Sequence, residues 1–294
     1  MTEKIALIGC GVMGQAIGGR LCETGNELTV FDLDDAKVAA LVAKGAKAGA
    51  SAADAASKAD YVILSLNSAA IVRAAAFGEA GVAEGAGTGA MIIDMSSIDP
   101  PSTRALNDEA AAKGLKWMDC PLSGGAPKAA IGQLTVMAGG SAEDFKASKA
   151  VMDQLCANFT HMGPSGAGQT TKLINQVLCA LHFSAMAEAT QLAIDAGVDA
   201  AKIPEAIRGG RADSAILQEF MGKFAAKDYS PTGNIDNMIK DLNGVQDLAR
   251  ETKTSMPLTA ACAEIHRLLS SAGMGASDNA VLMKYFEGPD KGDA

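Results

Sequence analysis

One lysine and two side-chain amides share a face of a predicted helix and could move a proton and orient a polar substrate. Lys172, Asn175 and Gln176 are spaced at i, i+3 and i+4, and Cys179 follows at i+7. A lysine that gains and loses a proton can act as general acid and base. A single lysine on a helix is most often a solvated surface charge, so this interpretation depends on the rest of the chain.

The segment that carries these residues is predicted to be one long helix. A Gly/Ser-rich turn that starts at Gly163 leads into an apolar-periodic pattern that continues to about Ala196. The pattern stops at Gly197, where a left-handed cap favours glycine. A helix of roughly 28 residues is about 42 Å long, which is enough to bridge two domains.

A glycine-rich turn near the N-terminus has the spacing of a dinucleotide-binding loop. Lys4–Ile8 is a predicted strand, residues 9–14 read GxGxxG, and a helical pattern follows to Glu23. The first glycine allows the tight turn, the second lets the backbone approach a pyrophosphate, and the third lets helix and strand pack closely. The helix N-terminus then attracts phosphate through its N–H groups and dipole. The residues expected to bind the cofactor here are Gly9, Gly11, Val12, Met13 and Gly14.

Asp32 stands at the end of the second predicted strand, Leu28–Phe31. A carboxylate at this point can hold the two ribose hydroxyls of an adenosine and would repel a 2′-phosphate. The expected cofactor is therefore NAD, with NADP less favoured. The alternative is that Asp32, with Asp34 and Asp35, only caps the next helix.

Strands and helices alternate through the first half of the chain, which predicts an α/β fold with a Rossmann-type, doubly wound parallel sheet. Further strands are expected at Tyr61–Leu66, Met91–Met95, Lys116–Cys120, Gln133–Met137 and Phe159–Met162. Ligands of such sheets lie beyond the carboxyl ends of the strands. Leu66 and Asn67, and Ser97 after the next strand, are therefore expected to line the nicotinamide half of the groove. Each could equally belong to an ordinary connecting loop.

Ser123, Gly124 and Gly125 follow the strand at Lys116–Cys120. Glycines leave backbone N–H groups uncovered, and with the serine hydroxyl these groups can form a small nest for a carboxylate. The alternative is a flexible turn.

Beyond Gly197 the pattern predicts helices and no strand. They are expected at Ile203–Arg208, Ile216–Ala225, Ile235–Glu251, Leu258–Ala272 and Asn279–Phe286. Arg211, in a glycine loop, could meet substrate or solvent. The tail Gly288–Ala294 is expected to be frayed. The predicted organisation is a dinucleotide-binding domain at 1–163, an interdomain helix at 164–196 and an all-helical substrate and oligomerisation domain at 197–294.

Composition narrows the classes of function. The 294 residues carry a net charge of −9 and no basic run, which argues against nucleic acid or an anionic membrane as partner. The six cysteines form no CxxC pair and only three histidines are present, so no metal site is expected. No apolar run is expected to be long enough to span a bilayer. The predicted location is the cytoplasm.

Four segments together resemble the β-hydroxyacid dehydrogenase family, to which 3-hydroxyisobutyrate dehydrogenase belongs. They are Gly9–Gly14, Pro121–Gly125, Gly163–Gln176 and Ile239–Leu242, in the order of the family. Residues 206–210 and 235–240 most resemble the tartronate semialdehyde reductase and threonate dehydrogenase branch. The resemblance implies a homodimer or homotetramer that interconverts a small β-hydroxy acid and its semialdehyde or keto acid.

The resemblance also implies roles for individual residues. Lys172 matches the catalytic lysine of the family, Ser123, Gly124 and Gly125 match its substrate-carboxylate loop, and Lys240 matches the lysine near the nicotinamide. Many members have asparagine four residues after the catalytic lysine. This chain has Gln176 there and Asn175 before it, so either could orient the substrate.

Two other functions fit the same fold, because fold does not dictate function. A non-catalytic NAD-binding protein would have no need of Lys172. An imine reductase should need a different proton donor at that position. The sequence names neither the hydroxy acid nor the direction of the reaction.

Overall fold

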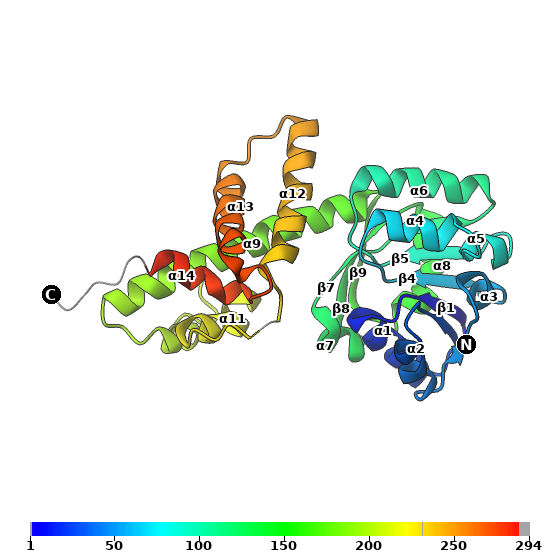
Figure 1. The fold of residues 1–294 in the computed structure, drawn as a ribbon, viewed down its shortest axis with the longest axis horizontal. Coiled ribbons are helices and arrows are strands. Elements are labelled where there is room, and N and C mark those ends of the chain that lie inside the picture. Colours follow the sequence, from blue (N-terminus) through cyan, green and yellow to red (C-terminus); the bar gives the residue numbers. More distant parts are fainter. Residues whose placement is uncertain (1, 231, 288–294) are drawn as a thin grey trace. The chain divides into compact units, whose positions relative to one another are not determined.

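The computed structural model describes residues 2–230 and 232–287, and the chain forms two compact units, Met1–Lys172 and Leu173–Ala294 (Figure 1). The predicted tail Gly288–Ala294 lies outside the described residues.

The first unit is built on one sheet of nine strands in the order β3-β2-β1-β4-β5-β6-β8-β7, with β9 paired to β8. All pairs from β3 to β6 are parallel, whereas β8 runs antiparallel to β6 and β7. The strands are β1 (Lys4–Ile8), β2 (Glu27–Phe31), β3 (Lys47–Ala48), β4 (Tyr61–Leu64), β5 (Met91–Asp94), β6 (Lys116–Asp119), β7 (Leu122–Ser123), β8 (Leu134–Gly139) and β9 (Cys156–Gly163). The predicted Rossmann-type parallel sheet is confirmed.

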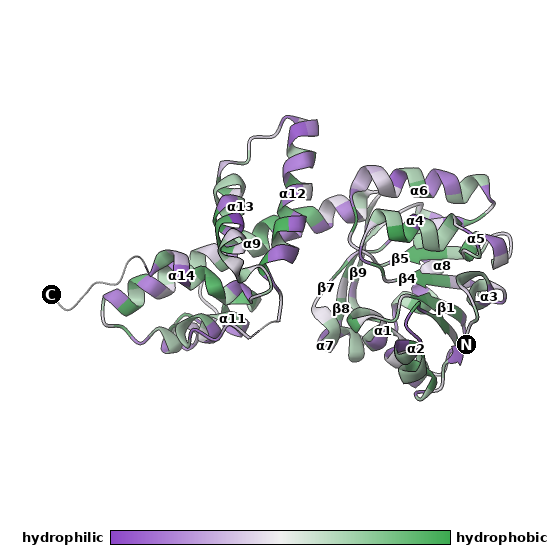
Figure 2. Ribbon diagram, in the orientation of Figure 1, coloured by the Kyte–Doolittle hydropathy of each residue, from purple (hydrophilic) through white to green (hydrophobic). Residues whose placement is uncertain are grey.

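Helices cover both faces of this sheet, which explains why its central strands are continuous apolar runs. Ile5 and Leu7 of β1 pack with α1, α2 and α8, whereas Ala6 and Ile8 pack with α3, α4, α5 and α6 on the other face. The helices are α1 (Val12–Glu23), α2 (Asp35–Val42), α3 (Ala52–Ala56), α4 (Ala69–Phe77), α5 (Val82–Gly85), α6 (Pro100–Ala112), α7 (Gly125–Ala130) and α8 (Ala142–Met152). In Figure 2 the central strands β4 and β5 are correspondingly green.

The only tryptophan of the chain, Trp117, lies on β6 in the core of the first unit. It is 2% exposed, and its ring centroid lies 6.0 Å from that of Phe77 on α4. The second unit therefore contains no tryptophan.

The long helix α9 (Ala167–Asp195) begins in the first unit and continues into the second. It ends where predicted, because Gly197 adopts a φ of 71° and the Val198 N–H bonds back to the Ala193 carbonyl. By length and composition α9 could cross a membrane, so the expectation that no such run exists is wrong. Core helices of soluble proteins pass the same test, and parts of α9 are buried: Gln169 lies buried in the first unit and Phe183 in the second.

Helices make up the rest of the second unit, and its described residues include no strand beyond an isolated bridge between Asn234 and Asp278. Its core is built from α9, α11, α12, α13 and the segment 279–283, with Phe183, Phe224 and Leu242 among the buried residues. The helices are α10 (Ile203–Ala206), α11 (Ala215–Ala225), α12 (Ile235–Thr252), α13 (Pro257–Leu269) and α14 (Met283–Phe286), with short turns at Ala200–Lys202, Ser270–Met274 and Asn279–Leu282. The predicted all-helical second part is confirmed.

Candidate functional site

The three glycines between β1 and α1 have the geometry that a dinucleotide loop requires. Gly9 has a φ of 97°, and a Cβ there would lie 2.3 Å from the Ser65 carbonyl oxygen. A Cβ on Gly14 would lie 2.0 Å from the Gly9 carbonyl oxygen, so only glycine lets α1 start this close to the strand. A Cβ on Gly11 would meet nothing within 4 Å. Gly11 therefore faces open space that a ligand can enter.

The N-terminus of α1 is available to an anion. Gly11 is its N-cap, no side chain caps it among the described residues, and its first turn holds no acid. Val12, the first residue of the helix, is 79% exposed. The first N–H groups of a helix have no partner within the helix, so this end fits a pyrophosphate.

Asp32 borders a cavity of about 460 Å³ at the carboxyl ends of β1, β2 and β4. Its carboxylate accepts hydrogen bonds from the N–H groups of Cys10 (2.7 Å) and Asp34 (2.9 Å). The N-cap of α2 is Asp34, whose side chain accepts from the Ala36 N–H. Asp32 thus joins the glycine loop to the cavity wall instead of capping α2.

The same cavity brings together five of the residues predicted to bind the cofactor, namely Gly9, Gly11, Asp32, Leu66 and Asn67. It is also lined by Leu33, Lys37 and Ile71, which sequence reasoning missed. Leu33 is 94% exposed. The signal that the sequence offered is its position directly after Asp32, at the end of a strand. Ile71 gave no signal, because it lies in an ordinary Ala-rich helical pattern.

Cys10, inside the glycine loop, stays protonated. Burial, together with the charge of Asp32, raises the pKa of its thiol to about 12. It therefore acts as a small core side chain and not as a nucleophile.

The loop Ser123-Gly124-Gly125 lies at the start of α7. Gly124 and Gly125 have φ values of 114° and 67°, so both are in the left-handed region that favours glycine. Ser123 ends β7 opposite Thr135 of β8. Because α7 packs against α1, this loop and the glycine loop belong to neighbouring elements of the first unit.

Lys172 lies in the second turn of α9, half-buried, as the last residue of the first unit. The first turn of α9 is held by residues that sequence reasoning missed. Gln169 is 1% exposed and donates from Nε2 to the Ser96 carbonyl at 2.8 Å. Asp119 accepts hydrogen bonds from the N–H groups of Gly166 (2.8 Å) and Gln169 (3.0 Å). A charged residue inside a buried strand, as at Asp119, was the available signal.

Two buried acids lie side by side at the ends of β5 and β6. Asp94 and Asp119 are register partners on these strands, and neither is exposed to solvent. Burial raises the pKa of Asp94 to about 7, and the charge of Asp119 adds to the effect, although hydrogen bonds from Ser96 oppose it. Burial also raises the pKa of Asp119.

The other predicted residues of the α9 face lie in the second unit, where they form a cluster with α12. The Asn175 amide donates to Gln176 Oε1 at 2.9 Å, and Gln176 Nε2 donates to Asp241 at 2.5 Å. Lys240 Nζ lies 3.6 Å from Asp241. Asp241, which was not predicted as a site residue, therefore links Gln176 to Lys240. Arg211 is exposed in its loop.

Comparison with known proteins covers nearly the whole chain. Residues 4–163 match the family model for the NAD binding domain of 6-phosphogluconate dehydrogenase. Residues 166–286 match the model described as NAD-binding of NADP-dependent 3-hydroxyisobutyrate dehydrogenase.

Individual relatives give the same result. The chain is 32% identical to the L-threonate dehydrogenase of Cupriavidus necator, over 98% of this chain and 97% of the relative. It is 34% identical to the NAD-dependent L-serine dehydrogenase of Pseudomonas aeruginosa, over 97% and 98%. Its fold is similar to that of Mycobacterium tuberculosis 3-hydroxyisobutyrate dehydrogenase with L-serine, with a TM-score of 0.88 and 27% identity over 97% of this chain and 99% of the other.

Proposed function

We propose, from the premise that this chain belongs to the 3-hydroxyisobutyrate dehydrogenase family, that it interconverts a small β-hydroxy acid and its semialdehyde or keto acid, and that Lys172 moves the proton. At the level of class, the protein is an NAD-binding oxidoreductase that acts on the CH–OH group of hydroxy acids. The substrate, the residue roles and the preference for NAD over NADP are the proposal.

The observation that carries the proposal is the make-up of the first unit. It holds the open Gly11, the uncapped start of α1 and Asp32 at the cavity, and it ends at Lys172 on α9. These features fit a dinucleotide: N–H groups for the pyrophosphate, a carboxylate for the ribose hydroxyls, and strand ends with Leu66, Asn67 and Ser97 for the nicotinamide.

Bound NAD supplies the acceptor for the hydride that leaves the substrate carbon. In oxidation the Lys172 amine takes the hydroxyl proton while the C–H bond breaks, and the products are the carbonyl acid, NADH and one proton. In reduction the Lys172 ammonium returns that proton to the new alkoxide. The Ser123 hydroxyl and the N–H groups of Gly124 and Gly125 hold the substrate carboxylate.

The contacts in the second unit support different proposed roles for Asn175 and Gln176. Gln176 is engaged by Asn175 on one side and Asp241 on the other, so we assign it to fixing Asn175. Asn175 then orients the substrate. Lys240, linked to the same cluster through Asp241, is assigned to the nicotinamide side of the cofactor.

The names of the relatives support the proposed substrate class. A hydroxy acid related to threonate, serine, glycerate or 3-hydroxyisobutyrate combines the carboxylate and the hydroxyl that these residues would bind. A panel of oxidations of these acids, each with NAD and with NADP, identifies the substrate and the cofactor. The proposal expects at least one acid to be turned over and NAD to be preferred.

Lys172→Ala tests the proton transfer. Loss of a general acid/base lowers turnover by about 10² to 10⁴ fold. NADH should bind nearly as before, because the proposed nucleotide contacts lie elsewhere. Lys172→Arg is the matched control: it keeps the charge but cannot act as a base near neutral pH. Wild-type turnover in either variant removes the lysine from the mechanism.

Asp32→Asn tests cofactor selection. The amide keeps the shape but loses the negative charge that would repel a 2′-phosphate, so affinity for NADPH should rise relative to NADH. Titration of both nucleotides into wild type and variant measures the ratio. Equal affinities in the wild type would overturn the role of Asp32.

The remaining parts of the proposal concern the whole protein. We propose a homodimer or homotetramer, since α9 and α13 expose Ile174, Leu178, Leu192 and Leu258. Sedimentation of the full chain measures this. We also propose a cytoplasmic location, in keeping with six cysteines that form no disulfide. The division at 1–163, 164–196 and 197–294 stays a proposal, which limited proteolysis tests.

A further inference from the structure

The start of α9 is anchored to the sheet by a buried carboxylate. Asp119 Oδ1 accepts the N–H of Gly166 and Oδ2 accepts the N–H of Gln169. An acid placed here satisfies N–H groups at the helix N-terminus and interacts favourably with its dipole. The approach is close: a Cβ on Gly168 would lie 2.7 Å from Asp119 Oδ2, and one on Gly139 would lie 2.4 Å from Oδ1.

Gln169 adds a second anchor in a different direction. Its Nε2 donates to the Ser96 carbonyl, and its Oε1 accepts the Ile98 N–H at 3.3 Å. The Gln169 side chain therefore spans the loop after β5 on both sides of Ser97.

Ser96 extends the connection to a third loop. Its hydroxyl accepts the Leu66 N–H at 3.0 Å, and its own N–H donates to Asp94 Oδ1 at 3.0 Å. The first turn of α9 is thus linked to the loops after β4 and β5. These loops carry Leu66, Asn67 and Ser97, which we assigned to the nicotinamide side.

Lys172 follows Gln169 by three residues, hence by about 4.5 Å along the axis of α9 and less than one turn. Hydrogen bonds in two directions at Gln169 restrain the helix from sliding along its axis and from rotating about it. The position of the Lys172 Cα atom is then fixed relative to the loops after β4 and β5.

We infer that Gln169 is a positioning residue, which fixes Lys172 against the nicotinamide loops. The inference rests on the proposed function, because it needs Lys172 to move the proton. The hydrogen bonds of Gln169 to Ser96, Ile98 and Asp119 lie within the first unit. Gln169 touches neither substrate nor cofactor in this scheme, so its effect is on the rate of the chemical step and not on binding.

The test uses the full-length protein and oxidation of L-threonate, or of the panel acid with the highest turnover. Gln169→Met keeps the length of the side chain and removes both hydrogen bonds. Because displacement of a catalytic group by about 1 Å costs up to about 10²-fold, kcat should fall by about 10- to 100-fold. KM and the Kd of NADH should stay within about threefold.

Thr190→Val is the matched control. Thr190 is a buried polar residue of the same helix, and its hydroxyl has no hydrogen-bond partner among the described residues. Removing it perturbs α9 without touching the anchor, so kcat should stay within about twofold.

Gln169→Glu provides a readout that a purely structural role would not give. A protonated carboxyl has one donor and one acceptor and can replace the amide, whereas the ionised form has no donor and repels Asp119. The ratio of variant to wild-type kcat should therefore rise as the pH falls from about 8 to about 6. The ratio for Gln169→Met should stay flat. Because this variant carries its own pH readout, the test holds even if Gln169→Met does not fold.

Several outcomes overturn the inference. One is wild-type kcat in Gln169→Met, and another is a pH-independent ratio in Gln169→Glu. A fall in kcat matched by an equal loss of NADH affinity would assign Gln169 to the general fold. Lys172→Met, measured alongside, separates the two proposals. If Lys172→Met keeps turnover, both the proposed function and the inference fail. If Lys172→Met loses turnover while Gln169→Met keeps it, only the inference fails.

Discussion

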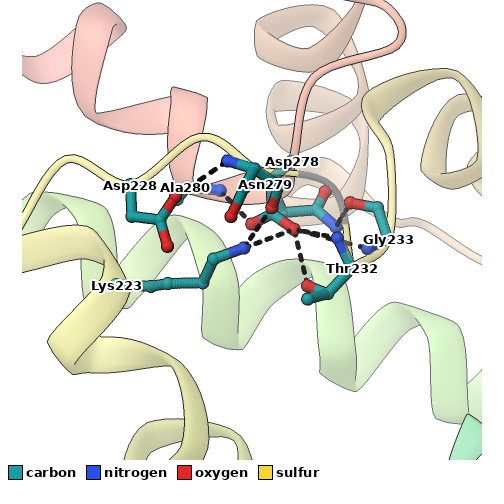
Figure 3. A network of polar contacts seen from close by, with 8 residues as sticks. Lys223, Asp228, Thr232, Gly233, Asp278, Asn279 and Ala280 are labelled. Atoms are coloured by element: carbon teal, nitrogen blue, oxygen red, sulfur yellow. Dashed lines mark hydrogen bonds and ion pairs between the residues drawn. The ribbon is translucent and has the colours of Figure 1, made fainter.

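Removing the Asp278 carboxylate should open the second unit locally, because this one side chain holds two distant segments together. Asp278 is 1% exposed and accepts hydrogen bonds from the N–H and hydroxyl of Thr232 at 2.8 and 2.6 Å. It also accepts from the N–H groups of Gly233 and Ala280 and pairs with Lys223 at 3.1 Å (Figure 3). Residues 232–233 and 278–280 are therefore joined through one carboxylate.

The size of the effect follows from burial. The Lys223 side chain is 14% exposed, so the ion pair is largely shielded from water. Breaking a buried pair from one side costs about 3 to 5 kcal/mol, since the remaining charge and the N–H donors lose their partner. We expect this loss for Asp278→Ala. Lys223→Met should cost less, about 1 to 3 kcal/mol, because the carboxylate keeps its N–H and hydroxyl donors.

The pH dependence has a definite sign. Burial alone raises the pKa of Asp278, but hydrogen bonds from Thr232 and Ala280 and the Lys223 ammonium outweigh it, so its pKa lies below the ordinary value. The stabilisation is then complete above the unfolded-state pKa of about 3.9 and is lost as the pH falls through the lower folded value. The stability difference between wild type and Asp278→Asn should be constant from pH 7 down to about 3.9, the unfolded-state pKa. It should shrink at lower pH.

Amide hydrogen exchange followed by peptide mass spectrometry measures the local opening free energy without assuming that both units unfold together. Asp278→Ala should speed exchange at 228–230, 232–235 and 277–283. A double-mutant cycle with Lys223→Met should give a coupling of about 1 to 3 kcal/mol. Asp228→Ala is the control, because this neighbouring acid is exposed. Unchanged exchange in Asp278→Ala, or an equal change in Asp228→Ala, would refute the reasoning.

Two further predictions concern the first unit. Gly14→Ala would place a Cβ 2.0 Å from the Gly9 carbonyl oxygen and should destabilise the first unit by about 1 to 3 kcal/mol. In Gly11→Ala the new Cβ meets no neighbour within 4 Å, so this variant should keep the stability of the wild type but lose affinity for NADH. Thermal unfolding and NADH titration of both variants check this, and equal stability of the two would contradict it. Because the pKa of Asp94 is raised to about 7, the wild type should lose stability relative to Asp94→Asn as the pH rises from about 4 to about 7. Thermal unfolding across this range measures the difference, and a difference that does not change with pH would contradict the buried, protonated acid.

The parts of the fold set by local patterns could be predicted from the sequence. The strand β1, the glycine turn after it and the ends of α9 match the expectations within a few residues, because apolar periodicity and glycine caps act within one segment. The strand at Tyr61 ends at Leu64, two residues early, since the Leu66 N–H bonds to the Ser96 hydroxyl instead of a neighbouring strand. That partner is 30 residues away.

Long-range pairing was beyond the sequence. The antiparallel insertion of β8 next to β6 depends on which strands meet, which no local pattern states. The anchor of α9 is similar, because Gln169 finds its partners 50 and 73 residues earlier in the chain. From the sequence alone, Gln169 was only an amide in the first turn of a helix.

The position of Trp117 makes the two units optically distinct. As the only tryptophan, buried on β6 against Phe77, it gives an emission signal that arises entirely from the first unit. Denaturation followed by this emission reports the sheet alone, whereas circular dichroism reports both units. A gap between the two transitions would therefore show directly that the halves of the chain unfold independently.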